Sequence, residues 1–137
     1  MSYLIDTNII SELIRSKPHH AVAEWFKNKP KDSLYLSVLT WGEIRKGIEK
    51  VTDNAKKKKL TVWLEQELPS WFYERILPVD HEVADRWGKI LAATQQSLPA
   101  IDSLIAATAI HYNLRLVTRN VKDFKSVPLL DIINPWD

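Results

Sequence analysis

The chain of 137 residues contains no cysteine and only three glycines. Without cysteine it can form no disulfide, no thiolate metal site and no cysteine nucleophile, and nothing in its composition indicates an oxidising compartment. The three glycines, Gly42, Gly47 and Gly88, are too few for a glycine-rich phosphate loop or a dinucleotide-binding fingerprint. A nucleotide cofactor is therefore not expected.

Long hydrophobic runs are also missing. No apolar stretch approaches the roughly 18 residues that a membrane-spanning helix needs, and the N-terminal segment lacks the basic flank and apolar core of a secretion signal. Apolar residues make up 45% of the chain and charged residues 26%, as in ordinary globular proteins. We expect one folded domain over residues 1–137, located in the cytoplasm and without a membrane segment.

The net charge is only +2, but the basic residues are concentrated in the first half of the chain. Such a concentration can attract phosphate groups, whereas a solvated helix face is the alternative explanation of any charge run. The candidates for contacts with a nucleic-acid backbone are Arg45, Lys46, Lys50, Lys56 and Lys57.

Short runs of β-branched and aromatic residues alternate with segments of helical periodicity. The runs, which are typical of strands, cover residues 3–5, 34–38, 75–79, 114–118 and 129–133. Between them apolar residues recur at three- and four-residue spacing, as over residues 60–68. This alternation predicts an α/β fold with a mostly parallel sheet covered by helices.

Two acidic residues stand where such a fold places its sites. Asp6 directly follows the first predicted strand, and ligands of open α/β sheets bind beyond the carboxyl ends of strands. Asp102 begins a helix predicted over residues 102–112 that is otherwise nearly all apolar, where an unpaired carboxylate is costly. For both residues, capping of the following helix is the alternative explanation.

Two further acids are weaker candidates on their own. Glu43 lies in the helix predicted after the second strand and points away from its apolar stripe, as a solvated residue also would. Asp123 lies in the turn after the fourth predicted strand, where aspartate is common.

Together the four acids occupy strand ends or helix starts of one α/β domain, which predicts that they converge. Carboxylate oxygens with few nitrogen ligands suit Mg²⁺ or Mn²⁺, ions that serve phosphoryl chemistry. The histidines show no paired ligand spacing beyond the adjacent His19 and His20, so zinc is a poor match.

Four segments resemble, in order, the PIN domain, specifically the VapC-type toxins and the similar FitB-like proteins. They are residues 4–8 (LIDTN), 37–47 (which contains Glu43), 101–109 (IDSLIAATA) and 116–124 (LVTRNVKDF). The resemblance implies a three-layer α/β/α sandwich and a ribonuclease dependent on Mg²⁺ or Mn²⁺. It also implies a homodimer that is inhibited by a cognate antitoxin. The two proteins would form a larger assembly, and the antitoxin would link this assembly to DNA.

By position, the family's acids correspond to Asp6, Glu43, Asp102 and Asp123, and the polar neighbours to Thr118 and Asn120. The resemblance implies that these acids hold one or two metal ions and that an activated water, rather than the ribose 2′-hydroxyl, attacks the RNA phosphate. The basic residues between Arg45 and Lys59 would then contact the RNA backbone.

Two alternatives belong to other functional classes. A phosphotransferase of the haloacid dehalogenase type also has an aspartate after its first strand, but it requires a second one two residues later, where this chain has Asn8. A PIN-fold binding module would act chiefly as partner of a DNA-binding antitoxin in an operator complex. The presence of all four acids favours the enzyme over the module.

Six tryptophans are more than one small core readily buries, and aromatic residues are enriched at interfaces. We therefore expect a homodimer that binds its antitoxin through an amphipathic segment lying in a groove between helices. The alternative is that the tryptophans simply pack the core.

Overall fold

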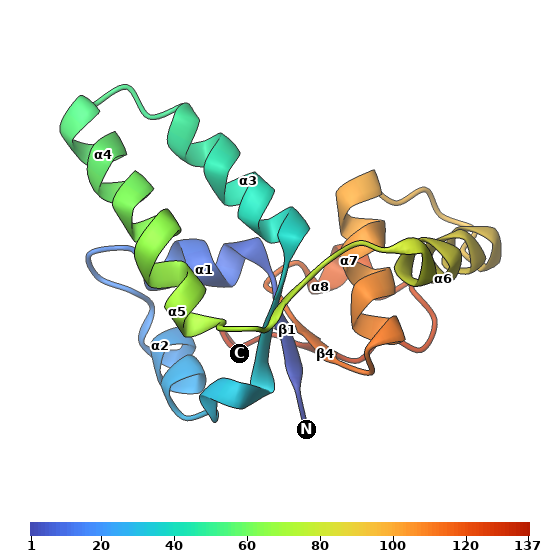
Figure 1. Cartoon of the computed structure of the whole chain (residues 1–137). Coiled ribbons are helices and arrows are strands. Elements are labelled where there is room, and N and C mark those ends of the chain that lie inside the picture. Colours follow the sequence, from blue (N-terminus) through green and yellow to red (C-terminus); the bar gives the residue numbers. More distant parts are fainter.

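Five short parallel strands form the centre of the structure, a computed structural model that describes all of residues 1–137 (Figure 1). The strands are β1 (Tyr3–Ile5), β2 (Leu34–Ser37), β3 (Ile76–Leu77), β4 (Arg115–Val117) and β5 (Ile132–Ile133). Their order in the sheet is β3-β2-β1-β4-β5. The alternation of strands and helices predicted from the sequence is confirmed, with every neighbouring pair parallel.

Helices connect the strands and cover both faces of the sheet. They are α1 (Thr7–Leu13), α2 (His20–Lys27), α3 (Val38–Glu49), α4 (Asn54–Val62), α5 (Leu68–Trp71), α6 (His81–Ala93), α7 (Ala100–His111) and α8 (Val121–Phe124). Two shorter helical segments are η1 (Lys31–Ser33) and the π-helical η2 (Trp63–Glu67). None of the helices is long and apolar enough to cross a membrane.

Alternate residues of β1 face two separate hydrophobic cores. Tyr3 and Ile5 contribute to the core beneath α1 to α5, whereas Leu4 contributes to the core beneath α6 to α8. This alternation follows from the two-residue period of a strand, which sends successive side chains to opposite faces. The three-layer α/β/α sandwich implied by the resemblance is confirmed.

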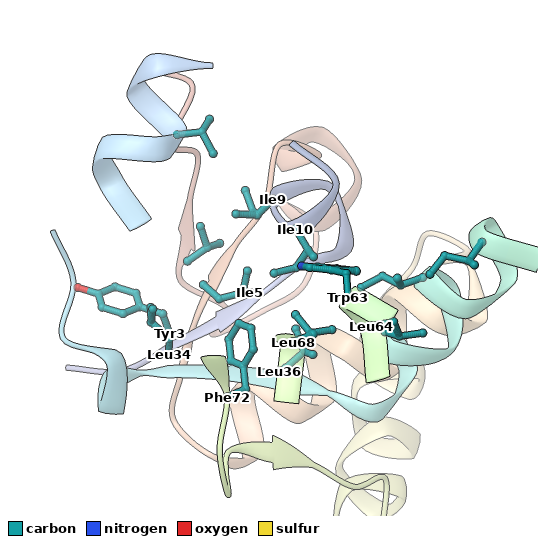
Figure 2. Close-up of a cluster of buried hydrophobic side chains, with 14 residues drawn as sticks. Tyr3, Ile5, Ile9, Ile10, Leu34, Leu36, Trp63, Leu64, Leu68 and Phe72 are labelled. Carbon is teal, nitrogen blue, oxygen red and sulfur yellow. The ribbon is translucent and has the colours of Figure 1, made fainter. Parts of the chain in front are cut away.

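The first core is built from strands, α1 and the segment around η2 (Figure 2). Phe72, Leu36 and Leu68 are fully buried there, and Trp63 is almost fully buried. In the second core, the small residues Ala106 and Ala109 of α7 let that helix approach the sheet closely.

Two helices differ from the sequence prediction. The apolar pattern over residues 60–68 is not one regular helix, because the chain widens into η2 just before Pro69. Proline donates no backbone hydrogen bond and its ring crowds the preceding turn, which a wider turn accommodates. Helix α7 begins at Ala100 with Pro99 at its N-cap, two residues earlier than predicted, so Asp102 lies within the first turn.

The order of the strands creates a crevice at the centre of the sheet. The chain adds β2 and β3 on one side of β1, and then β4 and β5 on the other side. Ligands of such sheets bind where this order reverses, outside the carboxyl ends of the strands. The position of β1 therefore places Asp6, its next residue, at the expected ligand site.

Candidate active site

Hydrogen bonds fix the Asp6 carboxylate where β1 and β4 end. Its Oδ2 accepts from Thr118 Oγ1 at 2.8 Å and from Asn8 Nδ2 at 3.3 Å. Its Oδ1 accepts from the Thr7 backbone N–H at 2.8 Å, so Asp6 also caps α1. The capping explanation of Asp6 is therefore confirmed for one carboxylate oxygen, while the other oxygen joins the two strand ends.

Asn8 connects the two strand ends a second time. Its Nδ2 donates to Thr118 Oγ1 at 3.2 Å, and its Oδ1 accepts from the Arg119 backbone N–H at 3.1 Å. Thr118, which is fully buried, also accepts a hydrogen bond from the Asn120 backbone N–H at 3.0 Å. Asn120 itself stands at the N-cap of α8, where its side chain makes no capping hydrogen bond.

Glu43 reaches the site from α3, the helix that begins after β2. Ser37 starts this helix by accepting a hydrogen bond from the Leu39 backbone N–H. One turn further on, the exposed Glu43 accepts a 2.7 Å hydrogen bond at Oε1 from Thr7 Oγ1. Thr7 and Asn8 thus orient the acids, although the sequence singled out neither as a site residue and included them only in the LIDTN segment.

Asp102 enters from the first turn of α7 and is half-buried. Burial raises the pKa of its carboxyl above the ordinary 3.8, and the negative charges of Asp6, Glu43 and Asp123 raise that pKa further. No side-chain hydrogen bond caps α7, so Asp102 is not a hydrogen-bonding cap, although its place in the first turn still lets it interact with the helix dipole. The structure therefore brings the four acids of the sequence analysis into one electrostatic field.

The acids of this field have no cationic partner. None of Asp6, Glu43, Asp102 and Asp123 takes part in an ion pair, while acids elsewhere, such as Glu12 and Glu49, pair with arginine or lysine. Burial also raises the pKa of the Asp6 carboxyl, with Glu43 adding to the rise and the hydrogen bonds from Thr118, Thr7 and Asn8 opposing it. The site combines concentrated negative charge with partial burial.

A hard divalent cation suits this set of donors. All four side chains offer carboxylate oxygens, the ligands that Mg²⁺ and Mn²⁺ prefer, and a cation would relieve the repulsion that raises the pKa of Asp102. The carboxylates do not form a preformed cage, since no three acidic, histidine or cysteine side chains are grouped to hold one ion. Binding would therefore draw the exposed Glu43 and Asp123 inward.

The basic candidates lie on the helical hairpin of α3 and α4, which projects from the sheet (Figure 1). Arg45 pairs with Glu65 at 2.6 Å and with Glu49 at 3.8 Å, and Lys57 pairs with Glu49 at 3.6 Å. Lys46 and Lys50 are exposed near the end of α3 and form no ion pair. Arg45 and Lys57, two of the five candidates, are thus already paired with acidic side chains of α3 and η2.

Lys56, the last of the five basic candidates, lies beside a groove. It lines a groove of about 860 Å³ between the end of α1, α4 and the η2–α5 segment, together with Lys58 and Lys59. Apolar side chains form most of this groove, among them Leu13, Ile14, Leu60, Val62, Trp63 and Trp71. The lysine run therefore borders an apolar groove.

Comparison with known proteins agrees with this architecture. The PIN domain family model matches residues 3–130. Toxin FitB from Neisseria gonorrhoeae is 35% identical over 136 residues, which cover 97% of each chain. VapC ribonuclease Y4jK from Sinorhizobium fredii is 33% identical, covering 98% of this chain and 97% of that protein.

Among solved structures, that of FitAB bound to an IR36 DNA fragment superposes with a TM-score of 0.90 at 32% identity, covering 98% of this chain and 96% of the other. The α/β/α sandwich is the architecture that the resemblance of the four segments implied. The chain belongs to the PIN-domain family, in the group that contains the FitB and VapC proteins.

We predict that Asp102→Asn stabilises the protein without metal at pH 7. The pKa of the folded carboxyl lies above 3.8, so ionising Asp102 costs stability as pH rises through that higher pKa, and asparagine avoids this cost. Because water screens the half-exposed carboxylate, we expect a gain of about 0.5–1 kcal/mol. The gain should shrink as pH falls toward 3.8. Denaturant melts in chelator between pH 4 and about pH 7 measure it.

Asp85→Asn is the matched control, because Asp85 is exposed on α6 and pairs only with Lys89. It should change the free energy of unfolding by less than about 0.5 kcal/mol. An Asp102→Asn variant that is less stable than the wild type at pH 7 would contradict the crowding of charge at the site. Asp102→Ala tests the helix dipole against the crowding of charge: loss of a favourable charge at the helix N-terminus would destabilise the protein, whereas relief of crowding offsets that loss or stabilises the protein.

Proposed function

We propose that the protein is a metal-dependent endoribonuclease and the toxin of a toxin–antitoxin pair. The observation that carries this proposal is the group of four acids that share one electrostatic field without a cationic partner. The similar proteins named Toxin FitB and VapC ribonuclease support both halves of the proposal. The substrate would be RNA, and the cofactor Mg²⁺ or Mn²⁺.

In this proposal Asp6 and Asp102 are the central ligands, and Glu43 and Asp123 are either ligands or groups that position the attacking water. When bound, a divalent cation lowers the pKa of a coordinated water and offsets the charge that develops on the phosphate. Attack by water rather than by the ribose 2′-hydroxyl leaves a 5′-phosphate and a 3′-hydroxyl.

Three neighbouring side chains orient these acids through hydrogen bonds. Thr118 donates to Asp6 Oδ2 and favours the ionised form that a cation needs. Thr7 donates to Glu43 Oε1 and holds this long side chain toward the site. Asn8 fixes the loop after β4 to the start of α1, so the acids from the two segments keep their spacing.

We expect RNA cleavage that requires Mn²⁺ or Mg²⁺ and that falls by at least about 100-fold in Asp6→Asn and Asp102→Asn. Each substitution keeps the shape of the side chain and removes a ligand charge, while positioning and charge stabilisation supply most of the rate of phosphoryl transfer. A gel assay with end-labelled RNA, which also identifies the product ends, measures this loss.

Asp85→Asn controls for the loss of one carboxylate elsewhere on the surface and should cut normally. Melting with Mn²⁺ gives a second readout, because the metal should stabilise the wild type more than Asp102→Asn. Cleavage by both site variants at the wild-type rate, or full activity in excess chelator, would refute the proposal. A folded wild type that never cuts RNA would instead favour the binding module.

The groove bordered by Lys56, Lys58 and Lys59 is the site that we propose for the antitoxin. Its lining includes the nearly buried Trp63 and the exposed apolar residue Val62. An amphipathic segment with an apolar face and an acidic edge would match the apolar lining and the bordering lysines. DNA would be contacted through this partner, by analogy with FitAB bound to DNA.

We predict that Val62→Glu weakens the complex with the antitoxin by at least tenfold. The new carboxylate would be buried against an apolar segment, which costs more than about 1.4 kcal/mol. Leu91→Glu is the matched control, because Leu91 is exposed to a similar degree on α6 and does not line the groove. Calorimetric titration with the cognate antitoxin measures the affinity. Equal affinities of both variants would place the antitoxin elsewhere.

We also propose that the protein forms a homodimer. Of the six tryptophans only Trp63 is buried, and the other five remain partly accessible on the monomer. Partly exposed aromatic residues favour an interface. Light scattering at about 20 μM, a concentration at which specific dimers with a micromolar Kd are formed, should give twice the 15.9 kDa of one chain. The mass of a monomer would contradict this prediction.

A further inference from the structure

One arginine stands beside the acids without joining them. Arg119 follows Thr118, whose hydroxyl binds Asp6, and its own backbone N–H donates to Asn8 Oδ1 at 3.1 Å. The backbone of Arg119 is thus fixed to the same two strand ends that hold the acids. Its side chain is exposed and takes part in none of the ion pairs of the structure.

An aromatic ring holds the Arg119 guanidinium. The guanidinium carbon lies 4.8 Å from the centre of the Trp136 ring, a cation–π contact. Trp136 packs against the first hydrophobic core, and its ring lies 6.4 Å from that of His19. Its backbone N–H donates to Asn134 Oδ1 at 3.0 Å, which fixes the C-terminal segment. The ring is therefore an anchored platform.

This arrangement keeps the donors of the guanidinium available. Three other arginines are occupied: Arg15 and Arg45 bind carboxylates, and Arg75 binds three backbone carbonyls. Arg86 and Arg115 also form no ion pair, but Arg119 is the arginine that directly follows Thr118, the partner of Asp6. The backbone of Arg119 adjoins the site, whereas its guanidinium is stacked on Trp136 and pairs with none of the four carboxylates. An exposed, unpaired positive charge on the loop next to an acidic site is suited to an anionic ligand that crosses that site.

We propose that Arg119, held on Trp136, binds a backbone phosphate of the RNA next to the cleaved bond. The inference rests on the proposed ribonuclease function and adds a substrate-binding residue to it. The planar guanidinium can donate two parallel hydrogen bonds to a phosphate, which a lysine ammonium cannot do. The contact would orient the RNA strand across the acids, while the α3–α4 hairpin lies further out (Figure 1).

The first test measures binding without cleavage. A fluorescein-labelled single-stranded RNA of mixed sequence is titrated in chelator at several salt concentrations, and anisotropy gives the Kd. Arg119→Ala should raise the Kd about tenfold and reduce the slope of log Kd against log salt by about 0.7, as expected for one lost phosphate contact. Arg119→Lys should keep the slope but recover only part of the affinity.

Two further variants separate the charge from its platform. Lys89→Ala removes a positive charge from an exposed position on α6 and should leave the Kd unchanged. Trp136→Leu keeps the arginine but removes the ring beneath it, so we expect a weaker contact with an unchanged salt slope. In cleavage assays with Mn²⁺, Arg119→Ala should raise KM about tenfold and change kcat by less than about twofold, because a flanking phosphate contributes to binding in the ground state.

The outcomes distinguish this inference from the proposed function. If the wild type binds RNA through Arg119 but never cuts it, the ribonuclease proposal fails and the phosphate site stands. If the wild type cuts RNA and Arg119→Ala matches Lys89→Ala in Kd and salt slope, the phosphate site is refuted. A variant that binds RNA normally but loses affinity for the antitoxin also refutes it, since Arg119 would then be a protein contact.

Discussion

The hydrogen bond from Thr118 Oγ1 to Asp6 Oδ2 is the contact on which the site depends. It joins the ends of β1 and β4, the two strands between which the order of the sheet reverses. The same strand ends are paired by the Asp6 backbone N–H, which donates to the Val117 carbonyl at 3.0 Å. A nearly buried carboxylate needs such partners, because an unsatisfied one would cost several kcal/mol. The geometry of the acids is therefore a consequence of strand pairing.

The negative charge of the site lowers the stability of the folded protein. Burial and the neighbouring acids raise the pKa of Asp102, so the ionised site is destabilising until a cation or another positive group arrives. Some acids elsewhere are paired, as Glu12 with Arg15 and Asp85 with Lys89. What distinguishes the site is that its acids act on one another, since Asp6, Glu43 and Asp123 raise the pKa of Asp102. Clusters of this kind persist where function requires the charge to remain available.

The basic candidate residues lie in two different surroundings. The lysines of α4 border an apolar groove on the side of α1, whereas Arg119 lies on the loop that follows β4. In the sequence the lysine run is the more visible feature, and it suggested either a phosphate-binding surface or a solvated helix face. In the structure two of the five basic candidates there, Arg45 and Lys57, pair with acids of the same hairpin. The less visible Arg119 keeps its guanidinium free of such pairing.

The sequence by itself determined the fold class and indicated the acids, because strand and helix periodicity and the order of the four segments are local properties that can be read directly. The tertiary structure decided what those residues touch. Asp6 and Thr118 are 112 positions apart, and Arg119 and Trp136 meet only because the C-terminal segment folds back beside the loop after β4. It also decided that Asp102 is not a hydrogen-bonding cap, since Pro99 is the N-cap of α7. Hydrogen bonds and shared fields across such separations depend on strand order and register, which no local pattern specifies.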